Sequence, residues 1–189
     1  MDYTSLSLDD VRGALEDVAE QAQVTFGALT SGQLNWRPDA KRWSVAQCFE
    51  HLLTANRLMR RAADDALDPS RSKPLWQRVP ILPGYVGRMM VRSQAPDATR
   101  KFMAPSAARP AASDLPGDVV QRFSAQQRES AALAAALDER LAARTVMSSP
   151  FLGIVTYSVL DGWRLMVAHN HRHFEQARRV TGSPGFPAA

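Results

Sequence analysis

Near its C-terminal end the chain reads His-Asn-His-Arg-His at residues 169–173, inside a longer run (163–180) whose apolar residues have the spacing of a helix. His169 and His173 are four positions apart, so on a helix their side chains share one face, about 5–6 Å apart. Two imidazoles at this spacing can bind one metal ion, although two ligands alone hold a metal poorly. The remaining histidine outside this stretch is His51, which lies in an earlier apolar-periodic segment. These positions give the hypothesis that the three histidines converge on one divalent metal with an open coordination position.

Helix phase separates the histidines of this stretch. His171 lies about 200° from His169 around a helix, so it should face outward to water and should not be a ligand. The expected inward stripe consists of Leu165, Met166, His169, His173, Gln176, Ala177 and Val180. Core packing is the alternative to a metal site, because a histidine in an apolar stripe is usually a core residue and such pairs also arise by chance.

Two helices are expected in the first third of the chain. A capping hydroxyl at Ser7 precedes a segment with apolar residues at spacings of three and four, which should end near residues 30–32. The second helix should begin after Ser44, because Ser44 and Gln47 form a capping-box pattern. On that helix His51 falls on the apolar face, so it should be buried.

The second half of the chain predicts two further helices. One should start near residues 114–116 and present an inner face of Val120, Phe123, Ala134, Leu137 and Leu141. The chain then breaks at residues 150–153. Thr156 is the expected cap of the last helix, and Gly182 should end it.

A long segment between the second and third helices has a different composition. Residues 68–113 hold seven of the twelve prolines, which excludes a long helix, although a short helix from Tyr85 to Val91 is compatible with the pattern. Residues 71–101 carry seven basic residues and one acidic residue. We interpret the segment as a basic excursion wrapped over the protein, with a lid as one role.

These patterns together predict the fold class. No segment shows convincing period-two alternation, so the expected fold is all-α: a four-helix bundle with a long, Pro-rich, basic excursion between helices 2 and 3. No composition shift argues for a second domain, so residues 1–189 are expected to form a single domain.

Composition limits the classes of function. The apolar fraction is 45% and the charged fraction 22%, and no run is long enough for a membrane span or shaped like a signal peptide, so we expect a cytoplasmic protein. The single cysteine, Cys48, excludes an intramolecular disulfide. Of the net charge of +4, the segment 71–101 carries +6, so the remainder is at −2 and a nucleic-acid partner is not expected.

Three short motifs occur in the order typical of a known family. They are the stretch from Trp43 to Leu52, the Pro-Phe-Leu-Gly sequence at 150–153, and the stretch from His169 to Gln176. The preceding Leu-Asn-Trp-Arg-Pro at 34–38 also matches the family's connection between its first two helices. In these motifs the chain resembles the DinB-like (YfiT-like) superfamily of metal-binding four-helix bundles, over residues 8–182.

The resemblance implies a divalent metal, zinc or nickel in most cases, held by one histidine of the second helix and two of the fourth. By position these are His51, His169 and His173, the set that helix phase also selects. Members of the family include S-transferases that use a low-molecular-weight thiol as cosubstrate, an isomerase and hydrolases, and many form homodimers. A small-molecule substrate and a homodimer are therefore expected as partners.

Three further residues have a candidate role in the site or with the substrate. Gln176 lies one turn beyond His173 and could orient a water or substrate, and Glu50 could contact a histidine N–H. Cys48 could be a soft fourth ligand or a reactive thiol. The alternatives are a polar residue near a helix end, a solvent-facing acid and a small core residue.

Two classes of function follow. The first is a metal-dependent enzyme, in which an ion lowers the pKa of a bound thiol or water; thiol transfer is preferred over hydrolysis because no general base is evident. The second is a non-catalytic, metal-stabilised bundle that acts through dimerisation or partner binding.

Overall fold

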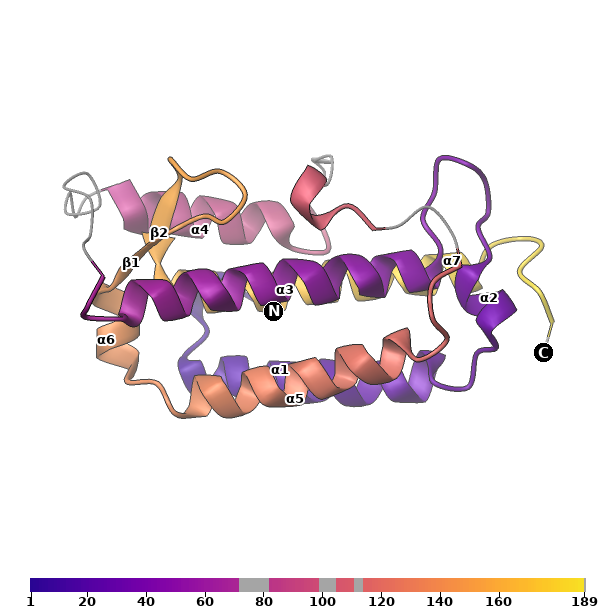
Figure 1. Ribbon diagram of the computed structural model, residues 1–189, viewed down its shortest axis with the longest axis horizontal. Helices are drawn as coiled ribbons and strands as arrows, with labels where there is room; N and C mark the ends of the chain where they lie inside the picture. The colour runs from indigo at the N-terminus through magenta and orange to yellow at the C-terminus, as the bar shows by residue number, and fades with distance from the viewer. Residues whose placement is uncertain (72–81, 99–104, 111–113, 189) are drawn as a thin grey trace.

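The computed structural model describes residues 1–71, 82–98, 105–110 and 114–188. Its four longest helices form a bundle (Figure 1): α1 (Leu8–Phe26), α3 (Val45–Leu67), α5 (Val119–Ala135) and α7 (Val159–Thr181). The shorter elements are η1 (Tyr3–Ser5), α2 (Ser31–Asn35), α4 (Leu82–Gln94), η3 (Ser106–Ala108), α6 (Glu139–Arg144), β1 (Val146–Ser148) and β2 (Thr156–Ser158). The predicted all-α bundle is confirmed.

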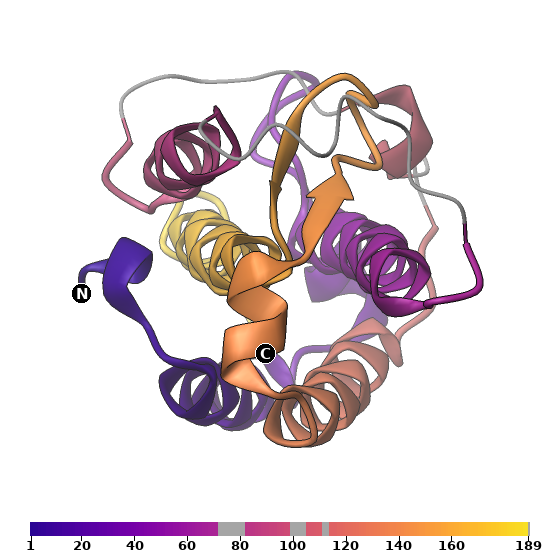
Figure 2. The same cartoon turned by 90° about the vertical axis from the view of Figure 1, so that its left-hand side faces the viewer.

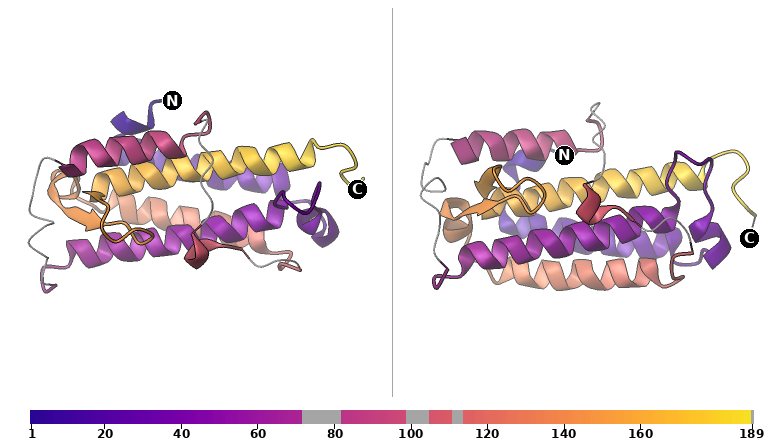
Figure 3. Two further views of the ribbon diagram at one scale, coloured as in Figure 1. Left: turned by 90° about the horizontal axis from the view of Figure 1, so that it is seen from above. Right: turned by 45° about the horizontal axis from the view of Figure 1, so that its top comes forward.

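The four long helices pack as a square, seen end-on in Figure 2, in which α3 contacts α5 and α7, and α1 contacts the same two helices. α3 and α7 run in opposite directions, whereas α3 and α5 run in the same direction (Figure 1). The chain must therefore return along the bundle between α3 and α5. α4 makes part of that return and packs against α7 on the outside of the square (Figure 3).

Local sequence signals explain where the helices begin and end. Ser7 and Ser44 each accept a hydrogen bond from the backbone N–H three residues later, and the side chains of Asp10 and Gln47 complete the two capping boxes. Gly182 caps the end of α7, as the sequence predicts. Ser44 and Gly182 thus set the start of α3 and the end of α7, the helices that carry the three candidate ligands.

The core has two apolar clusters along the bundle. In one of them Phe26 of α1 makes edge-to-face contacts with Phe49 of α3 and Phe174 of α7, at centroid distances of 5.3 Å each. Such aromatic pairs favour one mutual orientation of the helices that carry them. This cluster lies beside the candidate ligands on α3 and α7.

The structure corrects the expected third helix. It does not begin at residues 114–116 but at Val119, and it ends at Ala135, before Leu137 and Leu141. Leu141 lies on the separate helix α6 and is 54% exposed, so it is not an inner-face residue. A new helix can start there because the Asp138 side chain caps α6 at the backbone N–H of Leu141.

The structure also contains one short hairpin that no sequence pattern indicated. β1 and β2 form an antiparallel hairpin in which Met147 pairs with Tyr157. Thr156 lies in β2 and does not cap α7; Ser158 does, by accepting from the N–H of Asp161. Strands of three residues are too short to show an alternating pattern.

The described part of the excursion agrees with the sequence. The short helix expected from Tyr85 to Val91 lies within α4. Arg88 and Arg92 are exposed, and Arg71 forms an ion pair with Asp65 at 3.0 Å. The other basic residues of the segment, Lys73, Arg78, Arg100 and Lys101, lie outside the described residues. Among the helices described, none is long and apolar enough to cross a membrane.

Candidate metal centre

The antiparallel contact of α3 and α7 brings the three predicted histidines together. His51 comes from α3, and His169 and His173 come from successive turns of α7. The ring centroids lie 5.0 Å apart for His51 and His169, 4.7 Å for His51 and His173, and 4.6 Å for His169 and His173. One nitrogen from each ring lies within 4.8 Å of the other two, so the three residues could hold a metal ion.

A backbone carbonyl fixes the protonation of His51. Nδ1 of His51 lies 2.6 Å from the carbonyl oxygen of Ala108 in η3. A carbonyl only accepts, so Nδ1 carries the proton and donates it, and Nε2 keeps its lone pair. That lone pair points into the group of histidines, which is the arrangement that metal-binding histidines usually show.

The closest pair of nitrogens has the separation of two ligands on one ion. Nε2 of His51 and Nε2 of His169 lie 3.2 Å apart. Two nitrogens bound tetrahedrally at about 2.0–2.1 Å from zinc would be roughly 3.3 Å apart. Within the described part of the chain, Nδ1 of His173 is buried and makes no hydrogen bond. The donor set therefore fits a divalent cation.

The surroundings keep the imidazoles neutral. Burial lowers the pKa of His51, and the hydrogen bond to Ala108 opposes this effect. Burial, with His173 and His51 as neighbours, places the pKa of His169 well below its usual value. For His173, burial and the neighbouring His51 and Arg172 lower the pKa to about 3, while the Gln176 side chain acts in the opposite direction. Neutral imidazole is the form that binds a metal.

An aromatic residue covers one side of the group. The Trp43 ring, just before α3, stacks on His173 at 5.7 Å with an interplanar angle of 23°. It also lies 5.1 Å from His51. Together with the Ala108 carbonyl, this ring restricts how the two imidazoles can turn. No sequence pattern indicated a role for Trp43 or for Ala108, and a main-chain carbonyl leaves no signal in the sequence.

The additional candidates occupy different places. Gln176 lies next to His173. Glu50 faces α5, where its carboxylate lies 3.9 Å from Arg122. Cys48 is fully buried in the apolar cluster, where burial raises the pKa of its thiol to about 12. Among the described residues, the group that could hold a metal contains the three histidines and neither Glu50 nor Cys48.

His171 lies apart from the group, as helix phase predicts, but it does not face water. Its Nδ1 lies 2.9 Å from the Tyr3 hydroxyl of η1, and the two rings meet edge to face. The N-terminal turn therefore covers this side of α7. This contact leaves no local pattern in the sequence because it joins residues at opposite ends of the chain.

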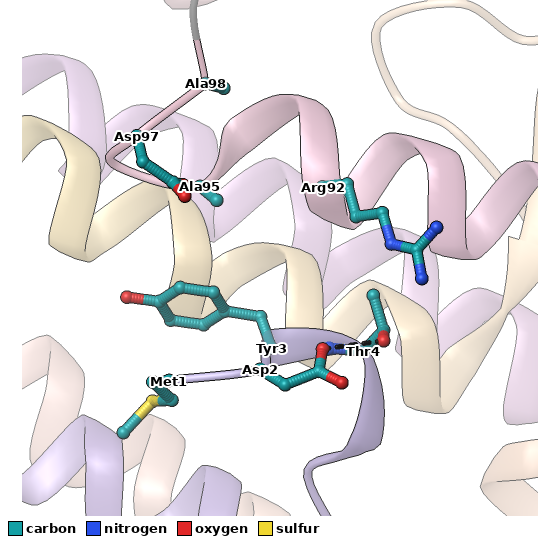
Figure 4. Close-up of a pocket in the computed structure, with 8 residues that line it drawn as sticks. All are labelled: Met1, Asp2, Tyr3, Thr4, Arg92, Ala95, Asp97 and Ala98. Carbon is teal, nitrogen blue, oxygen red and sulfur yellow. Dashed lines mark hydrogen bonds between the residues drawn. The ribbon is translucent and has the colours of Figure 1, made fainter.

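A surface hollow of about 370 Å³ lies on the same side of the molecule as His171. Figure 4 shows its lining, in which Asp2 and Tyr3 of the N-terminal turn face Arg92 of α4 and Asp97, which lies just after α4. The Asp2 carboxylate is already bound to the Thr4 backbone and hydroxyl. None of the three clustered histidines lines this hollow.

Fold and site together define a class of protein: a helical bundle with a three-histidine group between two antiparallel helices. The family model described as the DinB superfamily matches residues 14–177. The chain belongs to the DinB superfamily. Comparison with curated proteins and with solved structures found no match.

Proposed function

We propose that His51, His169 and His173 are the ligands of a divalent metal ion, zinc or nickel, and that the protein is a thiol-dependent S-transferase. The observation that carries the metal site is the convergence of three neutral imidazoles, one of them oriented by the Ala108 carbonyl. A divalent ion bound there would lower the pKa of a thiol or water that reaches it.

The charge of the site supports an anionic substrate group. Three neutral imidazoles leave the full charge of a divalent ion uncompensated, and no carboxylate belongs to the group among the described residues. The nearby Arg172 adds positive charge, as its effect on the pKa of His173 shows. A thiolate would neutralise part of this charge. In the transfer, its sulfur bonds to an electrophilic carbon, the leaving group departs with its electron pair, and the thiol proton passes to solvent.

A hydrolase of the same family is the first alternative. It would need a group that takes a proton from the attacking water. Gln176, the polar side chain next to His173, has no basic atom for this step, and Glu50 faces Arg122. The described residues therefore support thiol transfer better than hydrolysis.

A non-catalytic role is the second alternative. The close contact of Trp43 with His51 and His173, and the position of η3 over His51, would suit a closed site that only stabilises the bundle. Such a protein would act through a partner or as a homodimer, the assembly that the family resemblance implies.

The metal site is tested by elemental mass spectrometry on untagged protein. We expect about one divalent ion per chain, lost in His51→Ala, His169→Ala and His173→Ala. His171→Ala is the matched control. It removes an imidazole from the same helix, but that imidazole contacts Tyr3 and not the other histidines. Equal metal content in all four variants, or no metal after incubation of the wild type with zinc or nickel, would exclude the proposed site.

The transferase is tested separately with cobalt-substituted protein. A low-molecular-weight thiol should add a sulfur-to-cobalt charge-transfer band, and an electrophile should then be consumed with formation of a thioether. A cobalt spectrum that thiols leave unchanged would indicate the closed, non-catalytic site.

A further inference from the structure

A chain of three buried side-chain amides crosses the bundle next to the histidines. Asn56 of α3 donates to Oδ1 of Asn170 at 2.9 Å, and Asn170 of α7 donates to Oε1 of Gln127 in α5 at 2.8 Å. Each of the three side chains is 1% exposed or less. The three amides therefore join three of the four long helices through hydrogen bonds inside the core.

Two of the three amides lie close in sequence to the candidate ligands. Asn170 follows His169 directly on α7, and Asn56 is five residues after His51 on α3, about 7.5 Å along the helix axis. The pair Asn56 and Asn170 and the pair His51 and His169 both join α3 to α7, which run in opposite directions (Figure 1).

Apolar packing alone would hold the register of these helices less strictly. Burial of apolar surface has no preferred direction, so a small slide of α7 along α3 changes it little. A slide of α7 by the rise of one residue would move each of its side chains by about 1.5 Å relative to α3. Metal–nitrogen bond lengths tolerate a change of only about 0.2 Å. The hydrogen bond between the Asn56 and Asn170 side chains resists such a slide, because a slide would leave both polar groups buried and unpaired.

We propose that the hydrogen bond between the Asn56 and Asn170 side chains positions the metal ligands. It fixes the register of α7 on α3 and so keeps His169 and His173 opposite His51. The inference rests on the proposed metal site. Asn56 and Asn170 are positioning residues, since neither belongs to the group that could hold a metal. The second bond, from Asn170 to Gln127, joins α7 to α5, which carries none of the three histidines.

This difference supplies a matched pair of variants. Asn56→Leu and Gln127→Met are both close in volume to the native residue, and each leaves one half of the Asn170 amide unpaired. We expect similar losses of stability in the metal-free protein for both. Cobalt affinity should fall about tenfold in Asn56→Leu, the order seen when residues that orient metal ligands are lost, and its absorption bands should broaden. Gln127→Met should bind cobalt nearly as the wild type does.

A second measurement needs no metal. In the metal-free wild type, nuclear Overhauser cross-peaks should join the ring protons of His51 and His169, whose centroids are 5.0 Å apart. These cross-peaks should weaken or split in Asn56→Leu and persist in Gln127→Met. If Asn56→Leu does not fold, Asn56→Ala removes the same bond with a smaller side chain and should give the same result.

Each outcome decides the proposal. Equal loss of cobalt affinity in the two variants, or unchanged cross-peaks in Asn56→Leu, would reduce the amide chain to a stabilising feature and overturn the inference. If the wild type binds no cobalt, the proposed function fails, and the cross-peaks alone then decide whether Asn56 sets the register of α7.

Discussion

At the residue scale, the three histidines show how burial prepares a site for a cation. Each imidazole has its pKa lowered, with burial as the largest cause. Below its usual pKa of 6.5, a histidine is protonated in the unfolded chain, while the folded protein keeps it neutral. The unfolded state then binds more protons, so acid favours unfolding.

This imbalance predicts the pH dependence of the metal-free protein. The pKa of His173 is lowered from 6.5 to about 3. Its neutral form therefore costs the folded protein no stability above pH 6.5, and stability is lost progressively as the pH falls from 6.5 toward 3. The loss should reach about 1.4 kcal/mol per pH unit for this residue. Urea unfolding in a chelator between about pH 5 and pH 7 measures the slope. His173→Gln should have a shallower slope, and an identical slope would contradict the lowered pKa.

Cys48 gives a second prediction at this scale. Its thiol is fully buried and has its pKa raised to about 12, so it carries almost no thiolate at neutral pH. A thiol reagent should leave the native protein unmodified and should label one cysteine per chain in denaturant. Rapid labelling of the native protein would instead make Cys48 accessible, and would restore it as a candidate ligand.

At the scale of elements, α4 is held against α7 by a close approach at one glycine. A Cβ at Gly87 would overlap the carboxylate and Cβ of Asp161. Asp161 cannot easily move, because it is buried and pairs with Arg164 at 3.0 Å, and Arg164 also donates to the Leu6 carbonyl. Gly87→Ala should therefore cost about 1–3 kcal/mol, as expected for overpacking.

Gly13 is the matched control. It lies in the interior of α1, where a Cβ would meet nothing within 4 Å. Gly13→Ala should raise stability by roughly 0.5–1 kcal/mol, because alanine loses less conformational entropy in a helix. Thermal unfolding of both variants tests the contact, and a Gly87→Ala protein as stable as Gly13→Ala would show that α4 does not pack closely on α7.

The elements also show what could be predicted from the sequence. The caps at Ser7 and Ser44 and the apolar stripes are local patterns, so the long helices and the inward faces of His51, His169 and His173 could be predicted. The ends were less predictable: the first helix ends at Phe26 and not near residues 30–32, and the third begins at Val119. The hairpin of β1 and β2 could not be predicted, because its strands are stabilised by pairing with each other and not by a local pattern. For the same reason the contacts of Ala108 with His51 and of Tyr3 with His171 were not predicted.

At the scale of the whole molecule, the proposed metal would join α3 to α7 and therefore stabilise the bundle. An ion that binds the folded state and not the unfolded chain adds stability that grows with the logarithm of its concentration. At about one hundred times the dissociation constant, this gain is about 2.7 kcal/mol.

Thermal unfolding should show the gain directly. For a chain of this size, about 1 kcal/mol raises the midpoint by roughly 2–4 °C, so saturating zinc should raise it by roughly 5–10 °C, and a chelator should reverse the change. His51→Ala should lose the effect because it removes the ligand from α3, whereas His171→Ala should keep it.

The two variants should also differ in their stability without metal. His51→Ala leaves the Ala108 carbonyl without its donor, so its metal-free midpoint should fall, and the decisive quantity is the shift that zinc produces in each protein. A zinc-dependent shift of equal size in both would place the ion elsewhere on the protein.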